Sequence, residues 1–260
     1  MPPELSPALT AGMVFVLGCT VGSFLNVVIH RLPRGESLVR PGSHCPRCAA
    51  TIPPWANVPL LGYALLRGRC VRCQGPISAR YPLVEALTGG LFLALFLRWG
   101  LTPVLGVYWP LGATLIAVTF IDLDHQIIPN AITIPGMGIG LASAWACPFP
   151  PGPVDALLGF AGIGGLLWGI SALYERRTGR IGLGMGDVKL MAMLGAFLGL
   201  QATLGILVLG SLLGLGQAAV LLALHRAGRL TRIPFGPALA IAGAAHLFDP
   251  ALVTRLLAPP

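Results

Sequence analysis

Apolar segments separated by short polar stretches occupy most of the chain. An α-helix crosses the roughly 30 Å hydrocarbon core of a bilayer in about 20 residues, and several of these segments approach that length. We predict spans near Leu9–Val28, Leu83–Leu97, Val104–Ile121, Ala131–Ala146, Ala156–Leu173, Leu190–Leu200, Leu204–Leu224 and Phe235–Phe248. The sixth is short, so we expect it to tilt or to continue through Lys189. The pattern predicts an all-α polytopic membrane protein with about eight transmembrane helices.

The one long hydrophilic stretch follows the first span. It divides the chain into a first transmembrane helix (residues 1–31), a small hydrophilic domain (32–81) and a transmembrane domain with about seven helices (82–260). A domain of about fifty residues has too little core to fold without a disulfide, a metal or a similar constraint. We therefore expect a stabilising site inside it.

Composition excludes a soluble protein. Of 260 residues, 55% are hydrophobic and 10% are charged, whereas soluble domains carry about 25% charged residues. The 35 Gly and 24 Pro do not indicate disorder, because the chain is also rich in large apolar residues. The net charge of +8 does not indicate a nucleic-acid partner, because no aromatic residues interleave with the basic ones as stacking platforms.

The basic residues gather in three loops that share one side of the predicted topology. The groups are Arg31, Arg34, Arg40, Arg47, Arg67, Arg69, Arg72 and Arg80; Arg176, Arg177, Arg180 and Lys189; and Arg226, Arg229 and Arg232. Of the seventeen Lys and Arg residues, Arg98 and Arg255 alone fall on the other side. Because an excess of Lys and Arg marks cytoplasmic loops, we expect the hydrophilic domain on the cytoplasmic side and the N-terminus outside.

Four cysteines in the hydrophilic domain predict a zinc-ribbon-like fold. Cys45 and Cys48 form one C-x2-C pair, and Cys70 and Cys73 form a second after 21 residues. This spacing is close to that of four-thiolate zinc sites, which are structural because no coordination position stays open. The alternatives are two disulfides, which a reducing cytoplasm disfavours, or four free thiols. His44 is a further possible ligand, but four cysteines suffice.

Two carboxylates are predicted at the cytoplasmic ends of different spans. Asp122 ends the third span and Asp187 precedes the sixth, and a carboxylate at the membrane edge is costly enough to suggest a function. If the helices meet, the pair could share a proton, one acting as base on water and the other as acid toward a carbonyl. The alternative is that both are loop acids paired with Lys189 or Arg180. For Asp124 we favour that alternative, because it points about 200° away from Asp122 on a helix.

Several motifs in one order resemble a single family. They include Gly-x-Gly-Asp at 184–187, Asp-x6-Pro-Asn at 122–130 and the four cysteines. Further matching stretches are Gly22-Ser23-Phe24-Leu25-Asn26-Val27, His30-Arg31-Leu32-Pro33, Tyr81-Pro82-Leu83-Val84-Glu85, Asp187-Val188-Lys189-Leu190 and Phe235-Gly236-Pro237. Over nearly the whole chain, this set resembles the type IV prepilin peptidases, the bacterial branch of the GxGD membrane aspartic proteases.

The resemblance implies a bifunctional enzyme of the bacterial inner membrane. Such enzymes cut the basic leader from prepilins and type II secretion pseudopilins at the cytoplasmic face, then methylate the new N-terminal residue with S-adenosylmethionine. It implies that the catalytic aspartates are Asp122 and Asp187. It also implies the cysteine tetrad of full-length bacterial members, Cys45, Cys48, Cys70 and Cys73. The family often has Asp where this chain has Asn130, and neither the particular pilins nor the oligomeric state follows from the resemblance.

The site of the methyl donor has no sequence signature. The hydrophilic domain is too small for a Rossmann unit, which needs repeated βαβ segments. Gly22, Ser23, Asn26 and Glu85 are small or polar residues in apolar surroundings, and they are candidates where the first span meets the hydrophilic domain. Helix packing explains Gly22 and Ser23 equally well. Two competing classes, a small transporter with paired acids and a zinc-ribbon scaffold without activity, are disfavoured by the resemblance.

Overall fold

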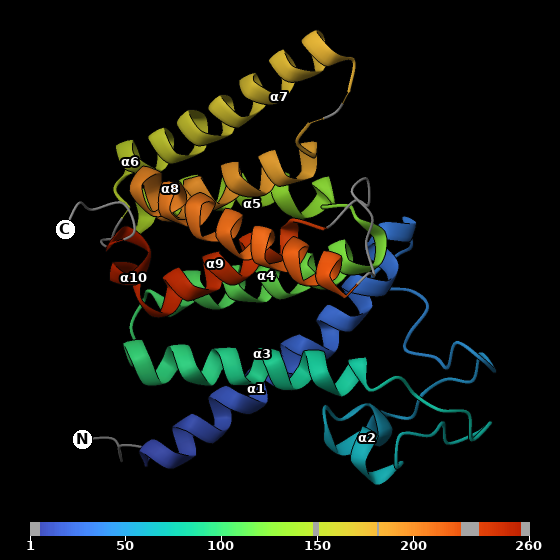
Figure 1. Cartoon of the computed structure of the whole chain (residues 1–260). Coiled ribbons are helices and arrows are strands. Elements are labelled where there is room, and N and C mark those ends of the chain that lie inside the picture. Colours follow the sequence, from blue (N-terminus) through green and yellow to red (C-terminus); the bar gives the residue numbers. More distant parts are fainter. Residues whose placement is uncertain (1–5, 148–150, 181, 225–233, 256–260) are drawn as a thin grey trace. The chain divides into compact units, whose positions relative to one another are not determined.

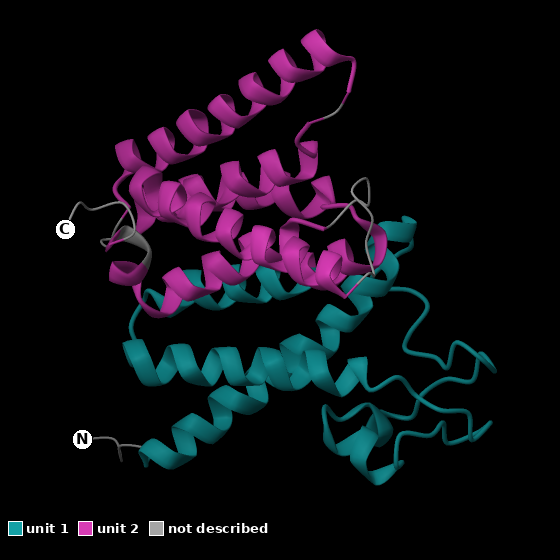
Figure 2. Ribbon diagram, viewed as in Figure 1, with its two compact units in different colours: residues 1–117 teal, residues 118–260 magenta. Residues whose placement is uncertain are grey.

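The computed structural model describes residues 6–147, 151–180, 182–224 and 234–255, and across these ranges the chain is helical, without strands. The predicted all-α class is therefore confirmed. The chain forms two compact units, residues 1–117 and 118–260 (Figure 2). These units are defined by packing, so the division at residues 31 and 81 stays a prediction. The basic group at 226–232 lies outside the described residues.

Unit 1 is built on two long helices that pack closely. Helix α1 (Pro7–Arg31) begins at Ser6, whose hydroxyl accepts a hydrogen bond from Leu9 N, and α3 covers Arg80–Trp99. A Cβ added at Gly18 would lie 2.7 Å from Gly89 Cα, so glycine is required where the two helices touch. Between them lie the short helices η1 (Leu32–Arg34), η2 (Pro54–Asn57) and α2 (Leu61–Leu65). Helix α4 (Leu105–His125) begins in unit 1 and continues into unit 2.

Unit 2 contains the end of α4 and the remaining helices (Figure 1). These are α5 (Asn130–Ala146), α6 (Pro153–Leu157), the π-helical turn η3 (Leu158–Ile163), α7 (Gly164–Thr178), α8 (Met185–Ala223), α9 (Gly236–Phe248) and α10 (Pro250–Arg255). The first part of α8 forms the core, since Leu190, Met193 and Leu194 are fully buried. Helix α8 thus holds unit 2 together.

Helix α8 is broken at Gly199, which has φ 83° and ψ 177°. Figure 1 shows the chain turning back at this point, so the predicted sixth and seventh spans are two helical segments joined by one residue. Asp155, at the start of α6, accepts a hydrogen bond from Leu200 N through Oδ1 (3.0 Å). This carboxylate caps the second segment, because it satisfies an N–H group that the break leaves without a helical partner.

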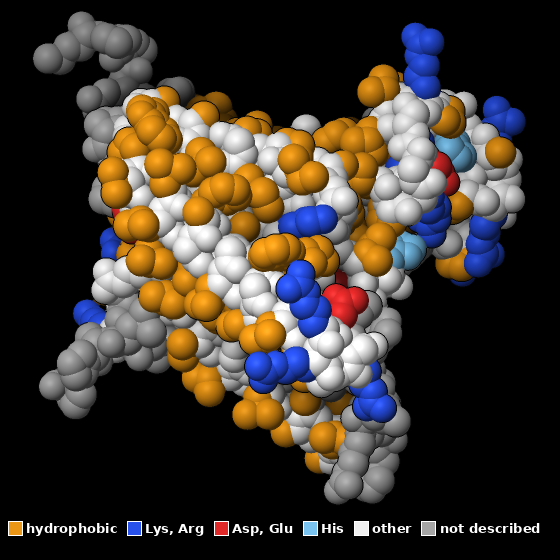
Figure 3. All heavy atoms as spheres, turned by 90° about the horizontal axis from the view of Figure 1, so that it is seen from above, with side chains coloured by type: hydrophobic (Ala, Val, Ile, Leu, Met, Phe, Trp, Pro, Cys, Tyr) orange, Lys and Arg blue, Asp and Glu red, His pale blue; other side chains and the backbone are white. Residues whose placement is uncertain are grey.

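Five helices in the described residues are long and apolar enough to cross a membrane. They cover Pro7–Arg34, Arg80–Trp99, Leu105–His125, Pro153–Thr178 and Met185–Ala223, and α9 is a shorter apolar helix. Apolar side chains spread over the outer helical surface (Figure 3). On α7, Leu166, Trp168 and Ile170 are each more than half exposed. A lipid-facing surface explains this exposure, whereas the count of eight spans stays a prediction.

Candidate active site and candidate metal centre

Asp122 is buried near the end of α4, with 5% of its surface exposed. Its Oδ2 accepts a hydrogen bond from the backbone N–H of Gly236 (3.0 Å), the first residue of α9. A Cβ added at Gly236 would lie 2.7 Å from that same oxygen. The start of α9 therefore fits against the carboxylate and fixes its orientation, and only glycine leaves room for the contact.

Asp187 lies in the first turn of α8 and is half-buried. Gly184 precedes the helix, and a Cβ added there would lie 2.9 Å from Asp187 Oδ2. The charges of Asp187 and Asp122 are close enough to repel each other. The structure therefore places both predicted acids in unit 2, within range of each other's charge, each with one carboxylate oxygen against a glycine.

The polar residues next to Asp122 and Asp187 do not pair with these two acids in the contacts described for them. Asp124 is exposed while Asp122 is buried, so the two side chains point apart as the helical geometry predicts. Lys189, one of the cations considered as a partner for Asp187, donates a hydrogen bond to Asn130 Oδ1 (2.8 Å). This bond joins the start of α8 to the start of α5 beside the two acids.

The cysteines lie on two loops of unit 1 with the same backbone pattern, which we name the first knuckle (residues 44–51) and the second knuckle (residues 69–76). Cys45 N donates to Ala50 O, and Cys70 N donates to Gly75 O, each over 2.9 Å. Each knuckle is closed by one antiparallel bridge, the pairs being His44–Thr51 and Arg69–Pro76. The domain is thus a duplicated unit, and each copy presents two thiols from one turn.

The four thiols converge on a common point. The sulfur atoms of Cys45, Cys48, Cys70 and Cys73 all lie within 4.8 Å of one another, and Cys45 Sγ is 3.9 Å from Cys73 Sγ. Tetrahedral Zn–S bonds of about 2.3 Å give sulfur separations of about 3.8 Å, whereas a disulfide requires about 2.05 Å. None of the four is in a disulfide. The donor set therefore fits a tetrahedral zinc ion.

Without a metal, electrostatics favour the thiolate at Cys45 but oppose it at Cys48, where a backbone hydrogen bond at Ala50 lowers the pKa but desolvation and the neighbouring thiols together raise it to about 11. Hydrogen bonds from the backbone N–H groups of Arg47 and then Cys48 lower the pKa of the Cys45 thiol to about 6. Cys45 is therefore largely ionised at neutral pH, the form in which sulfur binds a metal. His44 Nδ1 lies 3.0 Å from Gly42 O, so it has a backbone partner.

The residues considered for the methyl-donor site lie on α1 and α3. A Cβ added at Gly22 would be 2.7 Å from Glu85 Cα, so helix packing accounts for Gly22. Asn26 and Glu85 are both buried, at 8% exposure, and Asn26 Nδ2 donates to Tyr81 O (3.1 Å). Glu85 Oε2 accepts a hydrogen bond from Leu60 N (2.8 Å), which ties the hydrophilic domain to α3.

Gly236 is the residue of this site to which sequence reasoning gave no role. It stands in the Phe235-Gly236-Pro237 stretch, 114 residues after Asp122. A glycine directly before a proline at a predicted helix start was the available signal, because glycine permits close approach of another group. The pattern did not identify that group.

Two family models match consecutive parts of the chain. The bacterial peptidase A24 N-terminal domain matches residues 16–99, and the type IV leader peptidase family matches residues 109–219. The first match contains both knuckles, and the second contains Asp122 and Asp187. No solved structure matches the chain significantly.

Curated relatives agree with the family models. A prepilin leader peptidase/N-methyltransferase of Myxococcus xanthus is 47% identical over 236 residues, which cover 89% of this chain and 69% of the relative. Proteins of the same name from Neisseria gonorrhoeae and Pseudomonas aeruginosa are 38% and 40% identical, covering 92% and 88% of this chain and 90% and 86% of theirs. On these matches, the chain belongs to the type IV leader peptidase family.

Proposed function

We propose that the protein is a membrane aspartic endopeptidase that removes the leader from prepilins and pseudopilins and N-methylates the new N-terminal residue. The convergence of Asp122 and Asp187 in unit 2 is the observation that carries the peptidase half. The names of the relatives carry the methyltransferase half.

Peptide hydrolysis requires one base and one acid at the scissile bond. One aspartate removes a proton from water, and the resulting hydroxyl attacks the carbonyl carbon of the leader's last residue. The other aspartate, protonated, donates to the carbonyl oxygen. When the C–N bond breaks, the nitrogen takes a proton and becomes the new N-terminal amine. The Gly236 N–H holds Asp122 in place during these steps.

The sidedness of the site follows from charge. Loops rich in Lys and Arg mark the cytoplasmic face of the bacterial inner membrane, and by this rule the cysteine domain, the end of α4 and the start of α8 belong to that face. A prepilin has a basic leader followed by an apolar helix, so its scissile bond lies at the same interface. The acids can therefore reach the bond without drawing it into hydrocarbon.

The proposed enzyme uses a zinc ion and S-adenosylmethionine. Cys45, Cys48, Cys70 and Cys73 hold a structural zinc ion that joins the knuckles of a domain too small to fold without it. S-adenosylmethionine supplies the methyl group through its sulfonium centre. The proposed peptidase acids lie in unit 2 and the proposed zinc ligands in unit 1.

The test is mass spectrometry of a purified prepilin after incubation with the protein and S-adenosylmethionine, which reports cleavage and the added methyl together. Asp122→Asn and Asp187→Asn are expected to abolish cleavage, because each removes one proton-transfer group. Asp124→Asn is the matched control and is expected to cleave normally, since its side chain is exposed. Cleavage by either dyad variant, or none by the wild-type protein, contradicts the proposal.

A further inference from the structure

Three large apolar side chains are exposed on the two short helices η2 and α2 of the cysteine domain. Trp55 lies in η2, and Leu61 and Leu65 lie on α2 with 62% and 71% of their surfaces exposed. Residues four apart share one side of a helix, so the two leucines form a continuous apolar surface. We name these three residues the outer face. An exposed apolar group of this kind indicates a surface that meets a partner.

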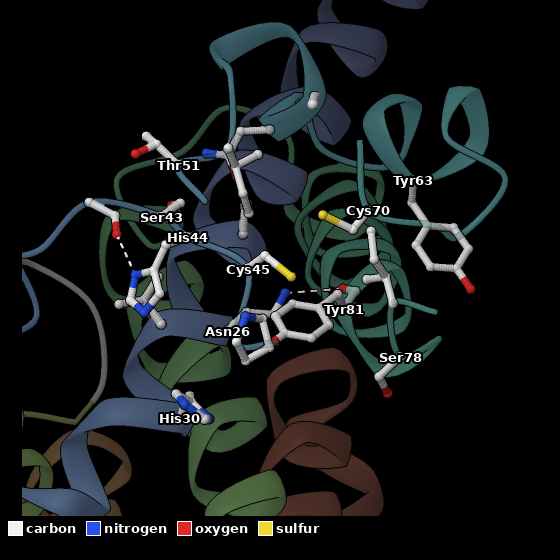
Figure 4. Close-up of a pocket in the computed structure, with 18 of the residues that line it drawn as sticks. Asn26, His30, Ser43, His44, Cys45, Thr51, Tyr63, Cys70, Ser78 and Tyr81 are labelled. Carbon is white, nitrogen blue, oxygen red and sulfur yellow. Dashed lines mark hydrogen bonds between the residues drawn. The ribbon is translucent and has the colours of Figure 1, made fainter. Parts of the chain in front are cut away.

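The other side of the same two helices borders a cavity of about 740 Å³ within unit 1 (Figure 4). Ala56 of η2 and Tyr63 of α2 line this cavity, whereas the three residues of the outer face do not. A Cβ added at Gly62 would overlap Ala56 O, so α2 fits tightly against η2. The outer face is therefore the side of a well-packed pair of helices that points away from the cavity.

A hydrogen bond sets the position of α2 along α3. Leu60 N, in the residue before α2, donates to Glu85 Oε2 over 2.8 Å, and Glu85 is the sixth residue of α3. Helix α3 is apolar enough to cross a membrane, and its 20 residues measure about 30 Å, the thickness of the hydrocarbon core. Glu85 is therefore about 7.5 Å inside the end of this span, and its bond brings the start of α2 close to that depth.

This depth is typical of a helix that lies in a membrane surface. Such helices bury their apolar side about 5–10 Å into the boundary between headgroups and acyl chains. At that level, Leu61 and Leu65 would meet lipid rather than water. Tryptophan is enriched at the same boundary, which suits the exposed ring of Trp55.

The charges beside the outer face have one sign. From Trp55 to Arg80 the sequence holds four arginines and no Asp or Glu. Arg67 and Arg69 follow α2 directly, Arg72 lies in the second knuckle, and all three are exposed. Basic residues close to a membrane are attracted to anionic headgroups. An acidic protein could also bind these arginines, but it could not reach leucines that lie below the headgroups.

We propose that the outer face binds the lipid bilayer in which the enzyme itself is embedded. Trp55, Leu61 and Leu65 insert into the membrane interface, and the arginines at positions 67, 69 and 72 bind anionic headgroups beside them. The cysteine domain therefore lies on the membrane surface instead of hanging from α1 and α3 in water. This surface requires neither peptidase nor methyltransferase activity, so its test can fail while the proposed function stands.

The direct test places a photoreactive side chain on the outer face. We replace Leu65 with p-benzoylphenylalanine in the full chain, reconstitute the protein in nanodiscs of phosphatidylcholine and phosphatidylglycerol, irradiate, and identify adducts by mass spectrometry. We expect phospholipid adducts at position 65. Leu61 is the second probe position and should behave alike, because it shares the helix face.

Val39 is the matched control for the probe. It is an exposed apolar residue of the same domain but lies in neither η2 nor α2. The Arg31 guanidinium, at the end of α1, donates to Ser37 O and Pro41 O and so holds the loop that carries Val39. We expect the probe at position 39 to give about tenfold fewer lipid adducts, because no contact draws that loop alongside a span.

Lipid composition tests the arginines. Replacing phosphatidylglycerol with neutral phosphatidylcholine should lower the adduct yield at position 65 about fivefold, because attraction to the basic residues is lost. Combining Arg67→Gln, Arg69→Gln and Arg72→Gln should remove most of this dependence on lipid charge. Arg98→Gln, in the last turn of α3, should retain it.

Zinc content, measured on the same nanodiscs, reports whether each probe protein is folded. Lipid adducts that are abundant at positions 61 and 65, scarce at 39 and dependent on anionic lipid support the proposal. Equal yields at all three positions, or no lipid adduct at 61 and 65, would overturn it. Cross-links from these two positions to a second copy of the chain would instead identify the outer face as a contact between protein molecules. A yield that ignores lipid charge would refute the role given to the arginines.

Discussion

Replacing Gly236 with alanine tests whether the start of α9 positions the Asp122 carboxylate. The added Cβ would lie 2.7 Å from Asp122 Oδ2 and 3.1 Å from its Cγ, whereas ordinary contacts begin at 3.4 Å. The methyl group and the oxygen must therefore separate by about 0.7 Å. Folding should survive, because Gly236 does not have the positive φ at which alanine would be strained.

The expected effect is on catalysis. A displacement of about 1 Å at a reacting group costs on the order of a hundredfold in rate, so 0.7 Å should cost roughly ten- to a hundredfold. This corresponds to a barrier raised by about 1.4–2.7 kcal/mol. The assay is the initial rate of prepilin cleavage by purified protein in nanodiscs, with methylation of a pre-cleaved peptide measured in parallel.

Gly138→Ala is the matched control. Gly138 lies in α5 of the same unit, and a Cβ added there has no neighbour within 4 Å. It should cleave at the wild-type rate, and both variants should methylate the pre-cleaved peptide normally. A Gly236→Ala protein that cleaves within about twofold of the wild type would refute the proposed positioning of Asp122.

Two further changes examine the metal centre and the broken helix. Cys45→Ser should abolish zinc binding, measured by elemental analysis of the purified protein, and should make residues 32–81 more sensitive to protease; unchanged zinc content would contradict the four-thiolate site. Asp155→Ala should destabilise the protein by about 1 kcal/mol and lower Tm by about 2–4 °C, because Leu200 N loses its acceptor. Asp155→Asn, which keeps an acceptor oxygen, should lose less stability. Equal Tm values for the wild type and Asp155→Ala would show that the hydrogen bond to Leu200 N does not stabilise the second segment of α8.

The hydrophobic pattern predicted the helices well, because a segment that crosses lipid must be apolar over about 20 residues and must form its backbone hydrogen bonds internally. Each predicted span has a helix in the structure, and the helical face that carries Asp122 rather than Asp124 is the buried one. The separation of the sixth and seventh spans was predicted close to the break at Gly199, and the sixth does continue through Lys189, since its helix starts at Met185. The contact that stabilises the break was not predicted, because its acceptor, Asp155, is 45 residues earlier in the chain.

The site was predicted through its acids and cysteines, whose chemistry is visible in the residue type. The contacts that hold these residues in place were not predicted. The bond from Gly236 N to Asp122 depends on how α9 meets α4, which no local pattern encodes. The repeated C-x2-C pair was visible in the sequence, but the backbone hydrogen bonds and the bridge that both knuckles share were not.

The break in α8 also bears on the thickness of the bilayer that this enzyme fits. From Met185 to Leu198 the first segment has 14 residues, or about 21 Å of helix, against about 30 Å of hydrocarbon. With Asp187 at one interface, Gly199 lies only about 18 Å along the helix and falls about 12 Å short of the other interface. Because Asp155 is exposed, we expect headgroups and water to reach inward to solvate it, and the bilayer to be thinner beside this unit. A prepilin helix arriving from a bilayer of ordinary thickness would then be longer than the local hydrocarbon core, and we expect this mismatch to expose its leader junction at the interface.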